Sequence, residues 1–190
     1  MASCDSEKAE RLVLTIGHST RTLEMFIHLL QIHRVKQVID IRTVPRSRHN
    51  PQFNHDTLPV DLKAADIGYL HMLGLGGLRR AHRDSINLGW RNASFRGFAD
   101  YMRTPEFENH LNELVKLAQD KRIALMCAET LPWRCHRSLI SDALEVREIK
   151  VAHILSATHL QPHHITPFAR WDGKFLIYPP TQNTTGPTPG

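Results

Sequence analysis

Apolar residues form five short runs along the chain, separated by longer segments of mixed polarity. The runs are rich in aliphatic side chains and occupy residues 11–16, 38–41, 69–73, 122–127 and 151–155. Continuous apolar runs of this length are typical of strands that are covered on both faces, as in a parallel sheet. The pattern therefore predicts five buried strands.

Helical periodicity fills the intervals between these runs. Thr104 followed by Pro105 has the chemistry of a helix N-cap and first turn, and Pro59 is also placed in a first turn. Strands that alternate with helices predict an α/β fold: a single three-layer, Rossmann-like domain with a mostly parallel sheet of about five strands and helices on both faces. The apolar positions of the predicted helices are Leu23, Phe26, Ile27 and Leu30; Leu62 and Ala65; Phe95, Phe98, Ala99 and Met102; Phe107, Leu111, Leu114 and Ala118; and Leu139, Ile140, Ala143 and Leu144.

The chain has 190 residues, a length that suits one such domain. We expect a flexible N-terminus over residues 1–10, a single domain over 11–178 and a disordered tail over 179–190. Asp172-Gly173 predicts the turn of a small terminal hairpin. Residues 78–92 contain four arginines and resemble a mobile loop.

Charge and cysteine content narrow the class of protein. Lys and Arg number 24 against 19 Asp and Glu, and this basic surplus favours an anionic small molecule or nucleic acid as the partner. Three cysteines are too few for a disulfide framework, and no apolar stretch approaches the roughly 20 residues that span a bilayer. We therefore expect a cytoplasmic monomer or homodimer without membrane contact, and the sequence identifies no cofactor.

The chemically unusual segments all follow predicted strands. They are GHST at 17–20, RTVPRSRHNPQF at 42–53, GLGG at 74–77 and CAETLPWRCHR at 127–137. Ligands of an open parallel sheet bind at the carboxyl ends of the strands, where the strand order reverses. The four segments are therefore expected to meet at one site, although polar loops at these positions also serve solubility alone.

Cys135 stands at the predicted start of a helix, where unpaired backbone N–H groups lower the pKa of a thiol and attract anions. It is the candidate nucleophile, with Glu129 as a further nucleophile or general base and His18 or His136 passing protons. Cys127 ends a strand and is explained equally well as a small core residue. We predict no metal, but Cys127, Cys135 and His136, with His18 as a further ligand, could assemble a site.

Spacing excludes several known motifs. Six residues separate Cys127 from Arg134, one more than a tyrosine-phosphatase loop has, and seven separate Cys127 from Cys135, so there is no C-x-x-C pair. GLGG does not complete a dinucleotide-binding fingerprint, and the chain has no Walker signature. Nucleotide-binding folds of these two kinds are therefore disfavoured.

A second set of residues is predicted to bind the substrate. Arginines would hold an anion, the paired glycines would let backbone approach it, and a loop tryptophan would stack on a base. Asp40 either orients an arginine or is the buried partner of an internal cation. The predicted substrate-binding residues are Ser19, Asp40, Arg42, Arg46, Gly76, Gly77, Arg96, Trp133 and Arg137.

Six motifs in order resemble those of domain-of-unknown-function family 488, a widespread bacterial and archaeal family. They are TIGHST at 15–20, DIRTVPRSRHNPQF at 40–53, YLHMLGLGGLR at 69–79, FRGFADYM at 95–102, CAETLPWRCHR at 127–137 and VAHI at 151–154. The resemblance covers about residues 12–156. It implies a compact cytosolic α/β protein but no particular reaction, and it places the characteristic positions on Gly17, His18, Ser19, Asp40, Arg42, Pro45, Gly76, Gly77, Arg96, Gly97, Cys127, Glu129, Cys135, His136 and Arg137.

These residues favour an enzyme of the hydrolase or transferase class that acts on a phosphate-bearing substrate, such as a nucleotide or nucleic acid. Two alternatives stay open. The net charge and arginine-rich loops also suit a nucleic-acid-binding module without catalysis. Cys127, Cys135 and the thirteen histidines also suit a cysteine-based redox or metal-binding protein.

Overall fold

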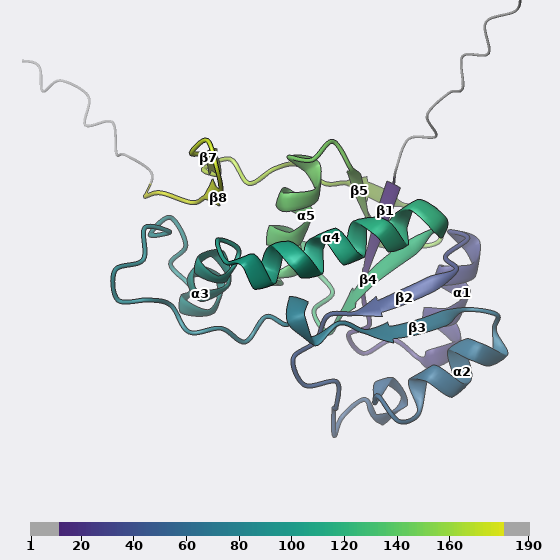
Figure 1. Cartoon of the computed structure of the whole chain (residues 1–190). Helices are drawn as coiled ribbons and strands as arrows, with labels where there is room; N and C mark the ends of the chain where they lie inside the picture. The colour runs from purple at the N-terminus through teal and green to yellow at the C-terminus, as the bar shows by residue number, and fades with distance from the viewer. Residues whose placement is uncertain (1–11, 181–190) are drawn as a thin grey trace, which may run out of the picture.

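A computed structural model describes residues 12–180, so the predicted N-terminal segment and most of the predicted tail lie outside the described residues. Six strands form one sheet in the order β3-β2-β4-β1-β5-β6, and Figure 1 labels β1 to β5 of this sheet. Five strands are parallel, and β6 pairs antiparallel with β5. The strands are β1 (Leu12–Gly17), β2 (Gln37–Asp40), β3 (Gly68–His71), β4 (Ile123–Cys127), β5 (Lys150–Ile154) and β6 (Leu160–Pro162).

Helices cover both faces of this sheet and confirm the predicted three-layer, Rossmann-like α/β fold (Figure 1). One buried cluster contains Phe26 of α1 and Leu62 of α2. The opposite cluster contains Phe98 of α3, Leu111 of α4 and Leu139 of α5. The helices are α1 (Leu23–Ile32), α2 (Leu58–Ala64), α3 (Ala93–Tyr101), α4 (Pro105–Asp120) and α5 (Arg137–Glu145), with short 3₁₀ turns η1 (Pro51–Phe53), η2 (Leu73–Leu75) and η3 (Pro132–Arg134).

The carboxyl end of β4 is the point where the chain changes sides of the sheet. β4 lies between β1 and β2. Both of these neighbours lead into helices on one face, α1 and α2, whereas β4 leads into α5 on the other face. Because the connections diverge at this point, a crevice opens where β4 ends, at Cys127.

Two local features differ from the sequence expectation. The sheet has a sixth strand, β6, which was not predicted because it is only three residues long and lies at the edge of the sheet. The predicted strand over 69–73 ends at His71, and a 3₁₀ turn follows it. The terminal hairpin is confirmed as β7 (Arg170–Trp171) and β8 (Leu176–Ile177), with Gly173 at φ +98° in its turn.

Residues 78–92 are tied to the body of the protein by the buried carboxylate of Asp100 in α3. This carboxylate accepts hydrogen bonds from the His82 backbone N–H, the Ser85 hydroxyl and the Asn87 amide. Asn87 also accepts a hydrogen bond from the Tyr178 backbone. The segment is therefore anchored at its centre, which argues against the mobile loop that the sequence suggested.

No helix within residues 12–180 combines the length and the apolar character needed to cross a membrane.

Candidate active site

A pocket of about 410 Å³ opens at the crevice beside the end of β4. It is bounded by the ends of β2 and β4, the GLGG segment, the start of α3 and the segment that joins β4 to α5. The lining residues are Arg42, Thr43, Val44, Gly77, Leu78, Asn92, Ser94, Phe95, Cys127, Ala128, Glu129, Arg134, Cys135 and His136.

The backbone after β4 packs directly on the end of β1. The backbone N–H groups of His18 and Ser19 donate to the carbonyls of Cys127 and Ala128, at 2.9 and 2.8 Å. A Cβ atom on Gly17 would lie 1.9 Å from the Glu129 carbonyl oxygen. Gly17 is therefore required for close approach of backbone to backbone, which sets the position of the loop that carries Glu129.

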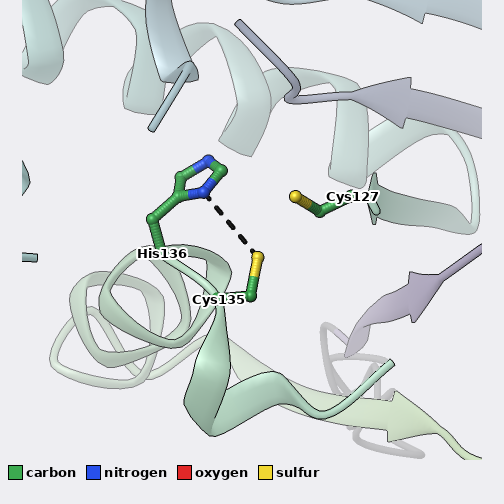
Figure 2. Close-up of side chains that lie close together, drawn as sticks. All are labelled: Cys127, Cys135 and His136. Carbon is green, nitrogen blue, oxygen red and sulfur yellow. Dashed lines mark hydrogen bonds between the residues drawn. The ribbon is translucent and has the colours of Figure 1, made fainter. Parts of the chain in front are cut away.

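Cys135 and His136 form a thiol–imidazole pair in the pocket. Cys135 Sγ lies 3.7 Å from Nδ1 of His136 (Figure 2). The other ring nitrogen, Nε2, lies 3.0 Å from the carbonyl oxygen of Leu75. Because a carbonyl can only accept, Nε2 carries the proton and Nδ1 keeps a free electron pair toward the sulfur. The ring is thus held in the tautomer that can take a proton from Cys135.

The surroundings of Cys135 favour its thiolate. Burial alone would raise the pKa of this thiol, but hydrogen bonding to Cys127 and the positive charge of Arg137 outweigh burial and lower the pKa to about 7. The backbone N–H of Arg137 also points at the sulfur, at 3.5 Å. The neighbouring Cys127 behaves in the opposite way, because hydrogen bonding to Cys135 and burial raise its pKa well above the ordinary thiol range.

Cys127, Cys135 and His136 could also hold a metal ion. Their ligand atoms, two sulfurs and one imidazole nitrogen, all lie within 4.8 Å of one another. The bond from His136 to the Leu75 carbonyl is the kind of outer contact that orients a metal-binding imidazole. Two thiolates and an imidazole facing a pocket suit Zn²⁺ with one open position.

Asp40 and Arg42 come from a second motif, and their polar atoms are almost fully occupied within the protein. Asp40 Oδ1 accepts from Nε and the backbone N–H of Arg42, and Oδ2 accepts from Nη2 of Arg42 and the Tyr69 hydroxyl, all at 2.7–3.0 Å. Arg42 also donates to the Phe53 carbonyl and to Nε2 of His18. One Nη1–H of Arg42 is left without a partner among residues 12–180, and the residue lines the pocket.

His18 lies beneath this ion pair and does not line the pocket. Its ring stacks on Phe53 at 4.4 Å, Nδ1 donates to the Ser19 carbonyl, and Nε2 accepts from Arg42. Burial lowers the pKa of His18 to about 4, and the bond to Ser19 offsets only part of this effect. His18 is therefore neutral at pH 7, with both ring nitrogens engaged, and its geometry suits positioning Arg42 better than carrying protons.

Arg137 is turned inward and is only 1% exposed. Its guanidinium donates to the carbonyls of Glu129 and Thr130, which fixes the loop after β4. No carboxylate among the described residues pairs with it, and its Nε–H has no partner among them. This buried charge therefore acts on Cys135 and on the loop, and the guanidinium is not presented to a ligand in the pocket.

Of the other predicted site residues, Glu129 is exposed at the pocket and Gly77 also lines it. A Cβ atom on Gly77 would lie 2.3 Å from His136 Nδ1, so glycine leaves the room that this ring needs. Gly76 packs on Thr43, where a Cβ would lie 2.7 Å from its hydroxyl.

Ser19, Arg46, Arg96 and Trp133 do not line this pocket. Arg46 is exposed and 3.9 Å from Asp56, and Arg96 reaches the Trp90 carbonyl. Ser19 has φ 47° at the end of β1, and Trp133 lines a separate cavity of about 270 Å³.

Sequence reasoning missed two groups that complete the pocket. Arg134 is an exposed cation on its wall, although its position just before Cys135 could have indicated this. The Leu75 carbonyl that fixes the His136 tautomer could not be found from side-chain types, because it is a backbone atom brought in by the 3₁₀ turn η2.

A second polar cluster joins the sheet to the C-terminal part of the chain. His153 bridges the Thr15 hydroxyl and His163, and His163 donates from Nε2 to Asp142 Oδ1 at 2.7 Å. The backbone N–H of Thr166 and the Tyr178 hydroxyl donate to the same buried carboxylate. Burial lowers the pKa of His153 to about 3, so this histidine is neutral and structural.

Comparison with known proteins gives one match. The chain has no match among curated proteins or solved structures. A family model described as "Domain of unknown function DUF488" matches residues 22–144, which include the ends of β2, β3 and β4 and most of α5. The matched region also holds every residue that lines the pocket. Because this family model matches more than half of the chain, the chain belongs to the DUF488 family.

Proposed function

We propose that the protein is an enzyme of the hydrolase or transferase class, with Cys135 as its nucleophile and an anionic, phosphate-bearing molecule as its substrate. One observation carries the proposal: His136 holds Nδ1 toward the Cys135 sulfur at 3.7 Å, with its tautomer set by the Leu75 carbonyl, inside an open pocket. A nucleophile beside an oriented base is the arrangement that covalent catalysis requires.

The reaction begins with transfer of the Cys135 proton to Nδ1 of His136. The thiolate then attacks the electrophilic carbon or phosphorus of the substrate, and the bond to the leaving group breaks. His136 returns its proton to that leaving group. Glu129, the carboxylate that lines the pocket, activates the water or acceptor that releases the covalent intermediate.

The cations of the pocket favour a substrate with negative charge. Arg42 lines the pocket with one N–H that has no partner among the described residues, and Arg134 is an exposed residue of the same lining. Asp40 pairs with Arg42 through its side chain, whereas no carboxylate among the described residues forms an ion pair with Arg134. A phosphate group would accept hydrogen bonds from these arginines, since guanidinium N–H groups match its oxygens.

Site-resolved alkylation tests the proposal on the reduced, chelator-treated full chain. We expect iodoacetamide to label Cys135 with a midpoint near pH 7, against about 8.5 for an ordinary thiol. Inorganic phosphate or a nucleoside triphosphate should slow the labelling, and R134Q should remove this protection. R122Q, at the amino end of β4, is the matched control that keeps it. A midpoint above pH 8, or labelling that no anion slows, would contradict the proposal.

A metal-dependent function is a second candidate, favoured by the three ligand atoms within 4.8 Å. In that case Cys135 would be a ligand instead of the nucleophile, and a bound water would occupy the open position. Titration of the reduced chain with Co²⁺ distinguishes the two candidates. A thiolate-to-cobalt charge-transfer band that C127S and C135S each abolish would favour the metal site, and its absence would favour the free thiol.

A further inference from the structure

Two sulfur atoms face the same pocket, and the proposed reaction uses only one of them. Cys127 ends β4 and Cys135 precedes α5, yet their sulfurs lie within 4.8 Å of each other. Figure 2 shows the Cys127 sulfur pointing toward the gap between Cys135 and His136. Cys127 is therefore placed to react with Cys135, beyond any role in filling the core.

Little movement separates the two sulfurs from a covalent bond. A disulfide needs a sulfur–sulfur distance of about 2.05 Å, so the atoms have less than about 3 Å to close. Cys127 is fixed in the sheet by its pairing with Gly17. The segment that leads to Cys135 includes the exposed residues Trp133 and Arg134, so movement of Cys135 meets the smaller resistance.

Access to the pair is restricted to small molecules. Cys127 is 7% exposed and Cys135 is 3% exposed, although both line the pocket. A hydroperoxide can reach a sulfur through such an opening, whereas a bulky disulfide such as oxidised glutathione would have to displace the surrounding chain. The geometry therefore selects a small oxidant and an internal partner thiol.

We propose that Cys127 and Cys135 form an oxidative modification site, at which a small hydroperoxide converts the two thiols into an internal disulfide. The inference rests on the proposed function only in taking Cys135 as the reactive thiol. Cys127 acts as the resolving thiol.

The first step oxidises Cys135. Its thiolate attacks one peroxide oxygen, so that a sulfur–oxygen bond forms and the oxygen–oxygen bond breaks. Cys135 becomes a sulfenic acid, and the peroxide, reduced by two electrons, leaves as an alcohol or water with the proton that His136 holds.

The second step forms the disulfide. The Cys127 sulfur attacks the Cys135 sulfur, the sulfur–sulfur bond forms, and the sulfur–oxygen bond breaks. Hydroxide leaves and takes the Cys127 proton as water. The product removes the nucleophile from His136, protects Cys135 from irreversible oxidation, and is reopened by a dithiol reductant.

Peptide mapping of the full chain tests the proposal. The reduced, chelator-treated protein is exposed to hydrogen peroxide, its remaining thiols are alkylated, and it is digested with trypsin without reductant. Trypsin cuts after Arg122, Arg134 and Arg137, so the two cysteines fall in separate peptides, 123–134 and 135–137. We expect these two peptides joined as one species, which dithiothreitol separates with full recovery of Cys135 labelling.

Two variants sharpen the test. C127S should leave Cys135 without a resolving thiol, so that peroxide adds two oxygens to it and dithiothreitol no longer restores labelling. C4S is the matched control and should form the disulfide as the unaltered chain does. Cys135 carrying two oxygens in the unaltered chain while Cys127 stays alkylatable, or Cys135 joined to Cys4, would overturn the proposal.

Labelling without peroxide separates this inference from the proposed function. If Cys135 labels with its midpoint near pH 7 and anions protect it, but peroxide joins no peptides, the disulfide alone is wrong. If Cys135 does not label as a reactive thiol at all, the proposed nucleophile is wrong, and the disulfide with it.

Discussion

Two motifs at the carboxyl edge of the sheet differ in which of their polar groups remain available to a ligand. Nearly every donor and acceptor of Asp40 and Arg42 is hydrogen-bonded within this pair, to Tyr69 or to the backbone. Cys135 and His136 instead face a pocket with a sulfur and an unprotonated nitrogen in reach of a ligand. The first arrangement maintains the shape of the site, and the second has the capacity to react.

The largest expected effect follows from a change in the Cys135–His136 motif. C135A removes the sulfur that carries the proposed chemistry, so we expect turnover of any substrate identified by the protection assay to fall by about 10³-fold or more. Folding should be nearly unaffected, since a small buried side chain is replaced by a smaller one. Steady-state rates check the loss of turnover, and thermal unfolding checks that folding is unaffected. Turnover within tenfold of the unaltered protein would place the nucleophile elsewhere.

A change in the Asp40–Arg42 motif is expected to affect stability instead of turnover. D40N removes the one carboxylate within residues 12–180 that pairs with the buried Arg42, and breaking a buried pair in this way costs about 3–5 kcal/mol of unfolding free energy. Urea unfolding measures the loss. D56N is the matched control, because its partner Arg46 is exposed at 3.9 Å, and it should change stability by less than about 1 kcal/mol. Equal losses in both variants would contradict the contrast between the two motifs.

A smaller effect should follow from crowding His136. G77A adds a Cβ where the nearest atom, His136 Nδ1, is 2.3 Å away, so the ring must move away from Cys135. We expect alkylation of Cys135 at pH 7 to slow by about tenfold, with a loss of stability of about 1–3 kcal/mol. G68A, whose added Cβ would meet its nearest atom at 3.4 Å, is the control that should alter neither quantity.

The last expected effect is a pH dependence of stability that originates in His18, which contacts Arg42. The folded pKa of His18 is lowered to about 4 from an ordinary value of 6.5, so the unfolded chain binds the proton more readily. Its stabilising contribution is present above pH 6.5 and is lost as the pH falls toward 4, by at most about 1.4 kcal/mol per pH unit. Urea unfolding between pH 6.5 and 5 should show a shallower dependence in H18Q. An unchanged slope would mean that His18 titrates normally.

The fold was predictable where burial is uniform. The run at 122–127 became the central strand β4, and Thr104 caps α4 by accepting the Phe107 N–H, because both signals are local and strong. β6 and the 3₁₀ turns were missed, since each is only three residues long and its conformation follows from neighbouring elements. The strand order, which puts β4 between β1 and β2, is a tertiary property that no local pattern contains.

The pocket lies where the sequence predicted a site, and the predicted residues line it only in part. Cys135, His136 and Glu129 line the pocket because they follow β4, as the edge rule for parallel sheets requires. Arg137 and His18 were expected to meet a ligand, but they are buried against backbone carbonyls. Residue type indicates that a donor exists, whereas only the packed chain determines which acceptor takes it.

The buried carboxylate of Asp142 joins α5 to the part of the chain that follows the sheet. The family model ends at residue 144, yet Asp142 takes its partners from His163, Thr166 and Tyr178. A chain truncated after residue 156 would leave this carboxylate buried without any of them. Amide hydrogens of α5 and of residues 160–178 should therefore exchange together, in one shared opening event.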